Sequence, residues 1–164
     1  MKAMMTKLID LTAASDVLTH QLAHPIVFTN GVFDLLHVGH VTYLRQARLL
    51  GNSLFVAINS DASARRLSKG PGRPVNTALD RANVIAALES VTAVGIFDED
   101  KPCDAIRAIQ PDIYVKGGDY DMEQLEETAI VRSWGGTSIA MEFVEGYSTS
   151  AIVNRVSTDN AGQS

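Results

Sequence analysis

The chain has 164 residues, of which 46% are hydrophobic and 20% are charged, and its formal net charge is −5. This length suits one domain with one hydrophobic core. The acidic balance argues against a general nucleic-acid binder, and no run approaches the roughly 18 consecutive apolar residues of a membrane span. Cys103 is the only cysteine, which excludes an internal disulfide, and the N-terminus lacks the apolar run of a signal peptide. We therefore expect a cytoplasmic protein without a nucleic-acid or membrane partner.

Short apolar runs alternate with helical patterns along the chain. The buried-strand patterns cover residues 25–30, 53–60, 94–97, 112–115 and 137–144. Helical patterns follow them, and one has a capping-box pair at Thr77 and Asp80 and an apolar stripe formed by Val84, Ile85, Leu88 and Val91. Strands that alternate with helices and lack hairpin turns predict right-handed βαβ units. The sequence therefore predicts a Rossmann-like, three-layer α/β/α fold with a five-stranded parallel sheet.

The chain divides into three parts around this sheet. We assign residues 1–24 to an N-terminal helical extension, 25–156 to the α/β domain, and 157–164 to a polar, disordered tail. Ligands of parallel sheets bind beyond the C-terminal ends of the strands, near the point where the strand order reverses. This rule directs attention to the segments that begin at Asn30, Ser60, Lys116 and Glu145.

The first of these segments, residues 29–40, carries two histidines. His37 and His40 are three residues apart, so at the start of a helix they share one face, and Gly39 between them leaves room for a bulky ligand. The free N–H groups of a helix N-terminus attract phosphate. Two imidazoles there can donate hydrogen bonds to phosphoryl oxygens as negative charge develops. The alternative is one core and one surface histidine, and the strand, glycine and helix around the pair favour the ligand site.

A basic segment interrupts the acidic chain between residues 65 and 81. Five basic residues face a single acid, Asp80, and the segment contains Gly70-Pro71-Gly72 and Pro74; the five are Arg65, Arg66, Lys69, Arg73 and Arg81. The alternatives are a solvated basic face and a shaped loop that binds an anion. A small anion with several phosphates suits the loop better than a long polymer does.

Other nucleotide-binding motifs are absent from the sequence: neither a P-loop nor a Gly-x-Gly-x-x-Gly after a strand occurs. The stretches 30–34 and 37–40 instead resemble the signature of the HxGH nucleotidyltransferase superfamily, whose cytidylyltransferase-like members share this α/β fold. Three further stretches, at 69–76, 115–120 and 145–150, are similar to the D-glycero-β-D-manno-heptose 1-phosphate adenylyltransferase family. The resemblance runs in order from about Ile26 to Val156 and makes residues 25–156 a nucleotidyltransferase domain.

The resemblance implies transfer of AMP from ATP, with Mg²⁺, to heptose 1-phosphate, which gives ADP-heptose and pyrophosphate for the lipopolysaccharide inner core. Many members of the family carry a sugar kinase upstream, so we expect a separate kinase to supply the substrate here. Relatives also suggest a homodimer or a larger homo-oligomer. In-line attack on the α-phosphorus requires positioning and charge neutralisation more than covalent chemistry.

These arguments divide the candidate residues into three groups. We expect catalytic roles for His37, His40 and Lys69. Heptose 1-phosphate is expected to contact Asp34, Lys69, Arg73 and Arg81, although a salt bridge within the fold is the alternative for Arg81. The nucleotide is expected to contact Asn30, Gly31, Phe33, Gly39, His40, Lys116, Gly117, Gly118, Asp119, Ser148, Thr149 and Ser150. Ser148 to Ser150 could instead only cap the last helix. No residue is assigned as a metal ligand, because the triphosphate and water hold magnesium.

Two alternatives to adenylyl transfer remain. Glycerol-3-phosphate cytidylyltransferases have an Arg where this chain has Phe143, and they favour Gly-Asp-Asp-Trp where it has Gly117-Gly118-Asp119-Tyr120. Val32 and Thr92 depart from the adenylyltransferase family, which usually has Cys and Asp there. The second alternative is an inactive nucleotide-binding scaffold, because a fold alone does not prove activity.

Overall fold

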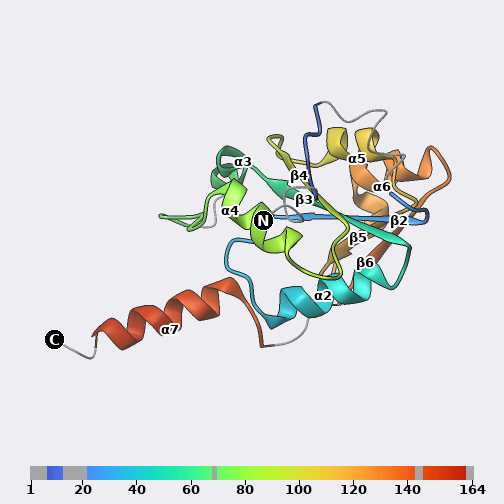
Figure 1. Ribbon diagram of the computed structural model, residues 1–164. Coiled ribbons are helices and arrows are strands. Elements are labelled where there is room, and N and C mark those ends of the chain that lie inside the picture. Colours follow the sequence, from blue (N-terminus) through green and yellow to red (C-terminus); the bar gives the residue numbers. More distant parts are fainter. Residues whose placement is uncertain (1–6, 13–21, 68–69, 143–145, 162–164) are drawn as a thin grey trace.

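The protein is built around one parallel sheet of six strands, with the spatial order β1-β4-β3-β2-β5-β6 (Figure 1). A computed structural model describes residues 7–12, 22–67, 70–142 and 146–161. The strands are β1 (Leu8–Ile9), β2 (Ile26–Gly31), β3 (Ser53–Asn59), β4 (Ala93–Phe97), β5 (Ile113–Gly117) and β6 (Thr137–Met141). All five neighbouring pairs are parallel, which confirms the predicted α/β class.

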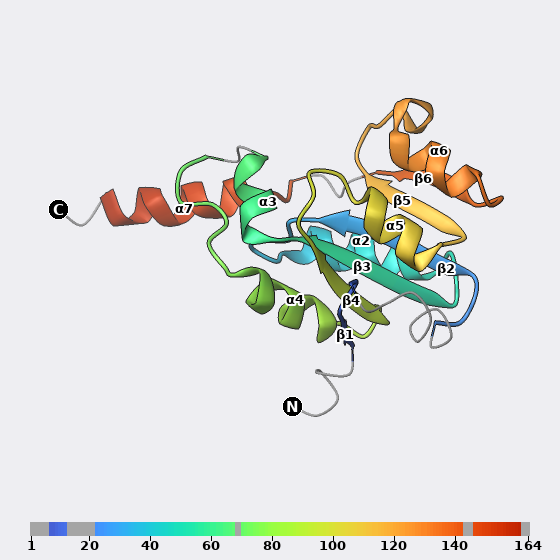
Figure 2. The same ribbon diagram turned by 90° about the horizontal axis from the view of Figure 1, so that it is seen from above.

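Helices cover both faces of the sheet and make three layers (Figure 2). On one face, α2 (Val38–Arg48) and α4 (Ala78–Ala86) bury Leu44 and Ile85 against β2, β3 and β4. On the other face, α5 (Cys103–Ile109) and α6 (Glu126–Arg132) bury Ile106 and Val131 against Phe28, Phe55 and Tyr114. The remaining elements are α3 (Asp61–Arg66), the 3-10 turn η1 (Met122–Gln124) and α7 (Thr149–Ala161).

The sheet has six strands where five were predicted, because Leu8–Ile9 adds β1 beside β4. This pair of residues lies within the extension that we expected to be helical. The backbone N–H of Val94 donates to the carbonyl of Lys7 (2.8 Å), and the ammonium of Lys7 donates to the carbonyl of Val91 (2.7 Å). Two residues are too few to produce a periodic pattern, so no apolar periodicity indicates this strand.

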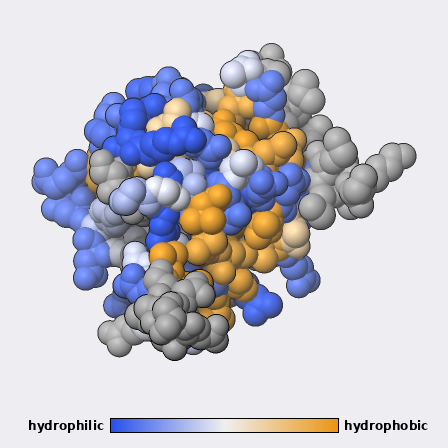
Figure 3. Space-filling model, turned by 90° about the vertical axis from the view of Figure 1, so that its left-hand side faces the viewer, coloured by the Kyte–Doolittle hydropathy of each residue, from blue (hydrophilic) through white to orange (hydrophobic). Residues whose placement is uncertain are grey.

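The C-terminal helix also departs from the prediction. Residues 157–161 continue α7, whereas a disordered tail was expected from residue 157 onward. The helix extends away from the sheet (Figure 1), and none of its described side chains, from Thr149 to Val156, is buried. Figure 3 views the side on which α4 and α7 lie, and an apolar area covers part of it. Exposed apolar side chains of these two elements include Leu79, Val84 and Val156.

Strand β2 lies at the centre of the sheet, with β3 on one side and β5 on the other. The chain builds β3 and β4 outward from one edge of β2, and then crosses back to build β5 and β6 on the other. The loops that follow β2 and β5 therefore diverge at a switch point, where the sequence predicted the ligand site. No helix among the described residues is long and apolar enough to cross a membrane.

Candidate active site

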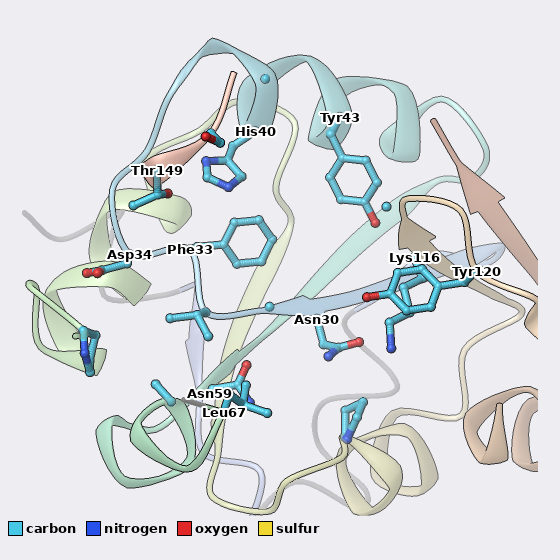
Figure 4. Close-up of a pocket in the computed structure, with 18 of the residues that line it drawn as sticks. Asn30, Phe33, Asp34, His40, Tyr43, Asn59, Leu67, Lys116, Tyr120 and Thr149 are labelled. Atoms are coloured by element: carbon cyan, nitrogen blue, oxygen red, sulfur yellow. The ribbon is translucent and has the colours of Figure 1, made fainter. Parts of the chain in front are cut away.

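A cavity of about 850 Å³ opens at this switch point (Figure 4). Its walls come from segments that are far apart in the sequence: the loop after β2, the N-terminus of α2, the end of β5, and the residues that begin α7. In the close-up, His40 and Thr149 lie on one side of the cavity, and Lys116 and Tyr120 lie on the other. The fold thus brings three of the four predicted motif stretches to one place, and the basic segment contributes Leu67, Arg73 and Pro74 among its described residues.

The two predicted catalytic histidines stack on each other at the N-terminus of α2. Their ring centroids are 3.8 Å apart with an interplanar angle of 24°. The backbone N–H of His37 donates to Nδ1 of His40 (3.4 Å), so the neutral ring of His40 carries its proton on Nε2. Nδ1 of His37 is buried and has no hydrogen-bond partner among the described residues, and burial lowers the pKa of this imidazole.

Gly39 allows the pair to pack this closely. A Cβ atom at this position would lie 3.0 Å from Nδ1 of His37 and 3.1 Å from Cβ of Tyr147. The sequence predicts that Gly39 leaves space for a ligand, and Gly39 does line the cavity; the glycine also makes space for the His37 ring and for Tyr147 before α7. An added Cβ would therefore require the side chain of His37 or Tyr147 to shift by a few tenths of an ångström.

The side chain of Phe33 packs against the imidazole of His40. Its backbone lies in the left-handed region at φ 48°, which is uncommon for a residue with a side chain. The ring is buried, meets His40 edge-on at 5.4 Å, and occupies the space that a Cβ on Gly31 would enter at 2.9 Å. Gly31 and Phe33 therefore fix the position of a histidine, and both line the cavity.

Asn30 is oriented by a buried tyrosine. The hydroxyl of Tyr114 donates to Oδ1 of Asn30 (3.0 Å), which leaves the amide Nδ2 as the donor that Asn30 can offer to a ligand. Burial raises the pKa of the Tyr114 hydroxyl, so it remains a donor at neutral pH. Tyr43 also lines the cavity; its hydroxyl pairs with Oγ1 of Thr29 (2.7 Å), and burial raises its pKa to about 12.

The end of β5 contributes a cation on an aromatic ring. The ammonium of Lys116 lies 4.4 Å from the ring centroid of Tyr120, and both residues line the cavity together with Gly117. The predicted contacts Gly118 and Asp119 do not line it. Gly118 turns the chain at φ 116°, and its N–H donates to the carbonyl of Met141 (2.8 Å), so it closes the turn beside β6.

Ser148, Thr149 and Ser150 line the cavity at the start of α7. Oγ of Ser148 accepts the N–H of Ala151 (3.1 Å), so this serine caps the helix, which was the simpler of its two interpretations. Oγ1 of Thr149 donates to the carbonyl of Leu35 (3.3 Å) and ties α7 to the histidine loop. Capping and phosphate binding are compatible, since a capped helix N-terminus still presents N–H groups.

Asp34 holds the basic segment against the histidine loop. Its carboxylate accepts the backbone N–H of Val75 (2.8 Å) and of Asn76 (3.0 Å), and Nη1 of Arg73 lies 3.5 Å away. The side chain of Asp34 is only 7% exposed. Arg73 lines the cavity, whereas Asp34, which also lines it, is already engaged within the protein. The structure thus favours an anchoring role for Asp34.

Arg81 does not line the cavity, so its predicted contact with the sugar phosphate is wrong. The residue is 1% exposed and pairs with Asp61 at 2.8 Å. Its guanidinium also donates to three backbone carbonyls, those of Asn76 (3.1 Å), Val32 (2.5 Å) and Asn59 (2.9 Å). The physical reason is its place on α4: the buried face of this helix contains Arg81, Ala82, Ile85 and Ala86, while Val84 of the expected stripe is 49% exposed.

Other parts of the basic segment also find partners inside the protein. Arg66 pairs with Asp100 at 2.6 Å and also donates to the carbonyl of Asp98. Lys69, a predicted catalytic residue, lies outside the described residues. Tyr120 and Tyr147 also line the cavity and were not predicted to do so, although both stand in motif stretches; Glu127 lines it as well, and no sequence pattern indicates that position.

A parallel sheet with an imidazole pair at the first helix N-terminus defines the nucleotidyltransferase class of α/β proteins. Residues 28–155 match the model of the family described as cytidylyltransferase-like. The chain therefore belongs to the cytidylyltransferase-like family, as its motifs predicted.

The chain also resembles individual proteins of this class. The chain is 53% identical over 147 residues to the D-beta-D-heptose 1-phosphate adenylyltransferase of Bordetella bronchiseptica, which covers 90% of each chain. It is also 53% identical over 133 residues to the bifunctional protein HldE of Methylobacillus flagellatus. This match covers 81% of this chain but only 27% of HldE. The crystal structure of a lipopolysaccharide core biosynthesis protein from Thermoplasma volcanium matches with a TM-score of 0.61 and 28% identity, over 75% of this chain and 98% of the other.

Proposed function

We propose that this protein transfers AMP from ATP to D-glycero-β-D-manno-heptose 1-phosphate and releases pyrophosphate, in the cytoplasm, as a step toward the lipopolysaccharide inner core. The observation that carries the proposal is the meeting of three motif stretches, from residues 30–40, 116–120 and 146–150, in one cavity. The 53% identity with the Bordetella adenylyltransferase supports the choice of substrates. One domain with one such cavity suits a single group transfer.

In the proposed reaction, a phosphate oxygen of the sugar 1-phosphate attacks the α-phosphorus of ATP. A new O–P bond forms, the bond between the α-phosphorus and the bridging oxygen breaks, and pyrophosphate leaves with the electron pair. The protein contributes donors that stabilise the charge on the five-coordinate phosphorus. Nε2–H of His40 is suited to this role because Nδ1 already accepts a backbone hydrogen bond.

The nucleoside and the phosphates of ATP would occupy different ends of the cavity. The helix N-termini of α2 and α7, with His37, His40 and Ser148–Ser150, favour the phosphates. Asn30, Lys116 and Tyr120 offer an amide, a cation and an aromatic face, which suit a base and a ribose. Arg73 stands on the remaining wall, where it can meet the sugar phosphate.

Magnesium would enter with the triphosphate. The described residues contain no group of three His, Cys, Asp or Glu side chains that could hold a metal ion, and Asp34 is engaged by backbone N–H groups. Phosphate oxygens and water commonly supply the ligands of Mg²⁺ in such sites. The ion would neutralise charge on the triphosphate, and the steps proposed for the protein's own residues do not pass through it.

A product analysis tests the function. The purified protein is given heptose 1-phosphate with ATP, CTP, GTP or UTP in turn, and the products are identified by mass. We expect ADP-heptose and pyrophosphate with ATP as the preferred nucleotide. A preference for CTP, or activity with glycerol 3-phosphate in place of the heptose, would support a cytidylyltransferase; no turnover with any pair would support the scaffold.

We further propose that the protein is a homodimer or a larger homo-oligomer in which α7 packs on a second copy. Helices of about 12–15 residues are marginal alone in water, and none of the described side chains of α7 is buried in the single chain. Ile152 and Val156 lie one turn apart and give the helix an apolar side.

Light scattering after size exclusion tests this assembly. Replacing Ile152 and Val156 together by Glu should give a monomer, whereas Leu49→Glu should not, because Leu49 is 85% exposed at the far end of α2. A wild-type protein that is already monomeric at tens of micromolar would contradict the proposal.

A further inference from the structure

Four carboxylates of the described residues line the cavity, and they differ in whether the protein supplies each with a partner. Three of the four are engaged within the protein: Asp34 by backbone N–H groups, Asp100 by Arg66 (2.6 Å), and Glu126 by Lys101 (3.1 Å). Asp100 and Glu126 are also well exposed, with 67% and 52% of their side chains accessible. The fourth carboxylate, that of Glu127, has no such partner in the part of the chain that the structure describes and belongs to a buried residue.

Glu127 is a buried residue that lines the cavity, and its carboxylate oxygens are not among the fully buried polar atoms without a partner in the described chain. It lies in the first turn of α6 and is 3% exposed. Among the residues that the structure describes, its side chain forms no hydrogen bond and no ion pair. Removing a carboxylate from water without a compensating hydrogen bond costs free energy, so buried carboxylates almost always have partners. Because Glu127 lines the cavity, a ligand can supply the partner that the protein does not.

The surroundings of Glu127 place it at the nucleoside end of the cavity. Its charge contributes to raising the pKa of the Tyr114 hydroxyl, for which burial is the main cause, and the pKa of the Lys101 ammonium, for which Glu126 is the main cause. Tyr114 in turn donates to Asn30. The cavity wall that carries Lys116 and Tyr120 lies opposite His40 and Thr149 (Figure 4). Glu127 therefore belongs with the side chains that face the base and ribose.

The negative charge of Glu127 favours the same orientation of the nucleotide in the cavity. A carboxylate repels the oxygens of a triphosphate, so the anionic part of the ligand is disfavoured next to Glu127 and favoured at the helix N-termini on the other side. An ionised carboxylate has no hydrogen to donate and can only accept. Among the groups of the nucleotide itself, the N–H and O–H donors of the nucleoside suit such an acceptor, whereas the phosphate oxygens do not.

We propose that Glu127 accepts a hydrogen bond from the nucleoside of the bound nucleotide, either from a ribose hydroxyl or from the 6-amino group of adenine. The inference rests on the proposed adenylyl transfer and adds a residue that selects the nucleotide. A site that pairs a buried acceptor with a ligand donor rejects analogues that lack the donor, because the acceptor is then left unpaired. If the 6-amino group is the donor, a base with a carbonyl at position 6 would place its carbonyl oxygen against the carboxylate of Glu127, and neither oxygen could donate a hydrogen bond.

Direct binding tests the proposal without requiring turnover. The affinity of ATP is measured by calorimetry for the wild type, Glu127→Gln, Glu127→Ala and the control Glu123→Gln, which removes an exposed carboxylate of η1 that does not line the cavity. Hydrogen bonds to charged groups correspond to a loss of about 10- to 100-fold. We expect that loss in Glu127→Ala, a smaller loss in Glu127→Gln, whose amide oxygen still accepts, and wild-type affinity in Glu123→Gln.

Three analogues of ATP identify the donor. They are 2′-deoxy-ATP, 3′-deoxy-ATP and inosine triphosphate, which has a carbonyl in place of the 6-amino group. The analogue that lacks the true donor should bind the wild type weakly, and it should bind Glu127→Ala as well as ATP does. If all three analogues lose the same factor as ATP in Glu127→Ala, the nucleoside is not the partner and the proposal is wrong.

Two further readouts separate this proposal from its alternatives. A structural role would lower the melting temperature of the free protein in Glu127→Gln, whereas removal of an unpaired buried charge should leave it unchanged or higher. An effect confined to the KM for heptose 1-phosphate would assign Glu127 to the sugar, and an effect that disappears without Mg²⁺ would assign it to the metal. Each of these results overturns the assignment to the nucleoside. Failure of the wild type to make ADP-heptose would instead overturn the proposed function, while nucleotide binding stays measurable.

Discussion

The histidine turn and the basic segment were both predicted to bind phosphate, but the fold uses them differently. At the histidine turn, Nδ1 of His37 is buried without a hydrogen-bond partner among the described residues, and Nδ1 of His40 accepts the backbone N–H of His37. In the basic segment, Arg66, Arg73 and Arg81 each lie beside a carboxylate of the same chain. Only Arg73 of these three lines the cavity.

The difference shows that a cluster of charge in the sequence is weaker evidence for a ligand site than a backbone geometry that leaves donors without partners. Helix α2 begins at the mouth of the cavity, and its first N–H groups have no partners within the helix. Three of the four arginines of the basic segment have long side chains that pair with acids outside the segment, at Asp100, Asp34 and Asp61. The net charge of the basic segment is therefore larger than the number of its cationic side chains that remain without an acidic partner among the described residues and could bind a phosphate.

Arg81→Ala should have the largest effect, and this effect should be on stability. The change removes four hydrogen bonds and leaves Asp61 and three carbonyls without their partner. Breaking a buried ion pair by removing one partner costs about 3–5 kcal/mol of unfolding free energy. Urea denaturation should show this loss, whereas Arg65→Ala, on the exposed side of α3, should stay within about 0.5 kcal/mol of the wild type. A stable Arg81→Ala with weaker ligand binding would restore the original prediction for this residue.

His40→Ala should have the next largest effect, and this effect should be on turnover. A donor that binds most strongly when charge develops contributes more to kcat than to ground-state affinity. Losing one such donor costs about 2.7–4 kcal/mol, a factor of roughly 100 to 1,000 in kcat, while the KM for ATP should change far less. Steady-state kinetics with heptose 1-phosphate measure both quantities, and a melting curve should show little loss of stability. Near-normal turnover would mean that the stacked pair is structural.

Arg73→Ala should have a smaller effect, confined to binding. The guanidinium lies 3.5 Å from Asp34, which keeps its backbone donors when the arginine is removed, so the fold should remain intact. We expect a rise of about tenfold in the KM for heptose 1-phosphate or ATP, as for the loss of one charge-assisted hydrogen bond. Arg66→Ala is the matched control, because Arg66 pairs with Asp100 outside the histidine turn. If the two variants have the same kinetics, the basic segment does not bind phosphate.

The strands and the histidine site could be predicted because each rests on local patterns. Strands β2 to β6 stand where apolar runs predicted them, and Thr77 caps α4 by accepting the N–H of Asp80 (3.2 Å). Strand β1 could not be predicted, because its two residues form a strand only through their pairing with β4. Arg81 illustrates a signal that was available: it precedes Ile85 by four residues, which puts both on the buried face of α4. Glu127 gave no signal, because its burial depends on how α6 packs beside β5.

His37 should give the smallest effect, a dependence of stability on pH. Burial lowers the pKa of its imidazole below the ordinary value of 6.5, so the unfolded chain binds a proton more readily than the folded protein does. Unfolding free energy should therefore rise with pH between the lowered pKa and about 6.5, and this contribution should be lost as the pH falls through that window. One proton limits the slope to about 1.4 kcal/mol per pH unit. Urea denaturation from about pH 5 to 7 should give a shallower profile for His37→Asn than for the wild type. His24, which is exposed and pairs with Asp112 at 2.6 Å, supplies the matched variant His24→Asn for the same measurement. If His37→Asn and the wild type have parallel profiles, the ring is not held neutral by burial, and its unpaired Nδ1 cannot be counted among the atoms that distinguish the histidine turn from the basic segment.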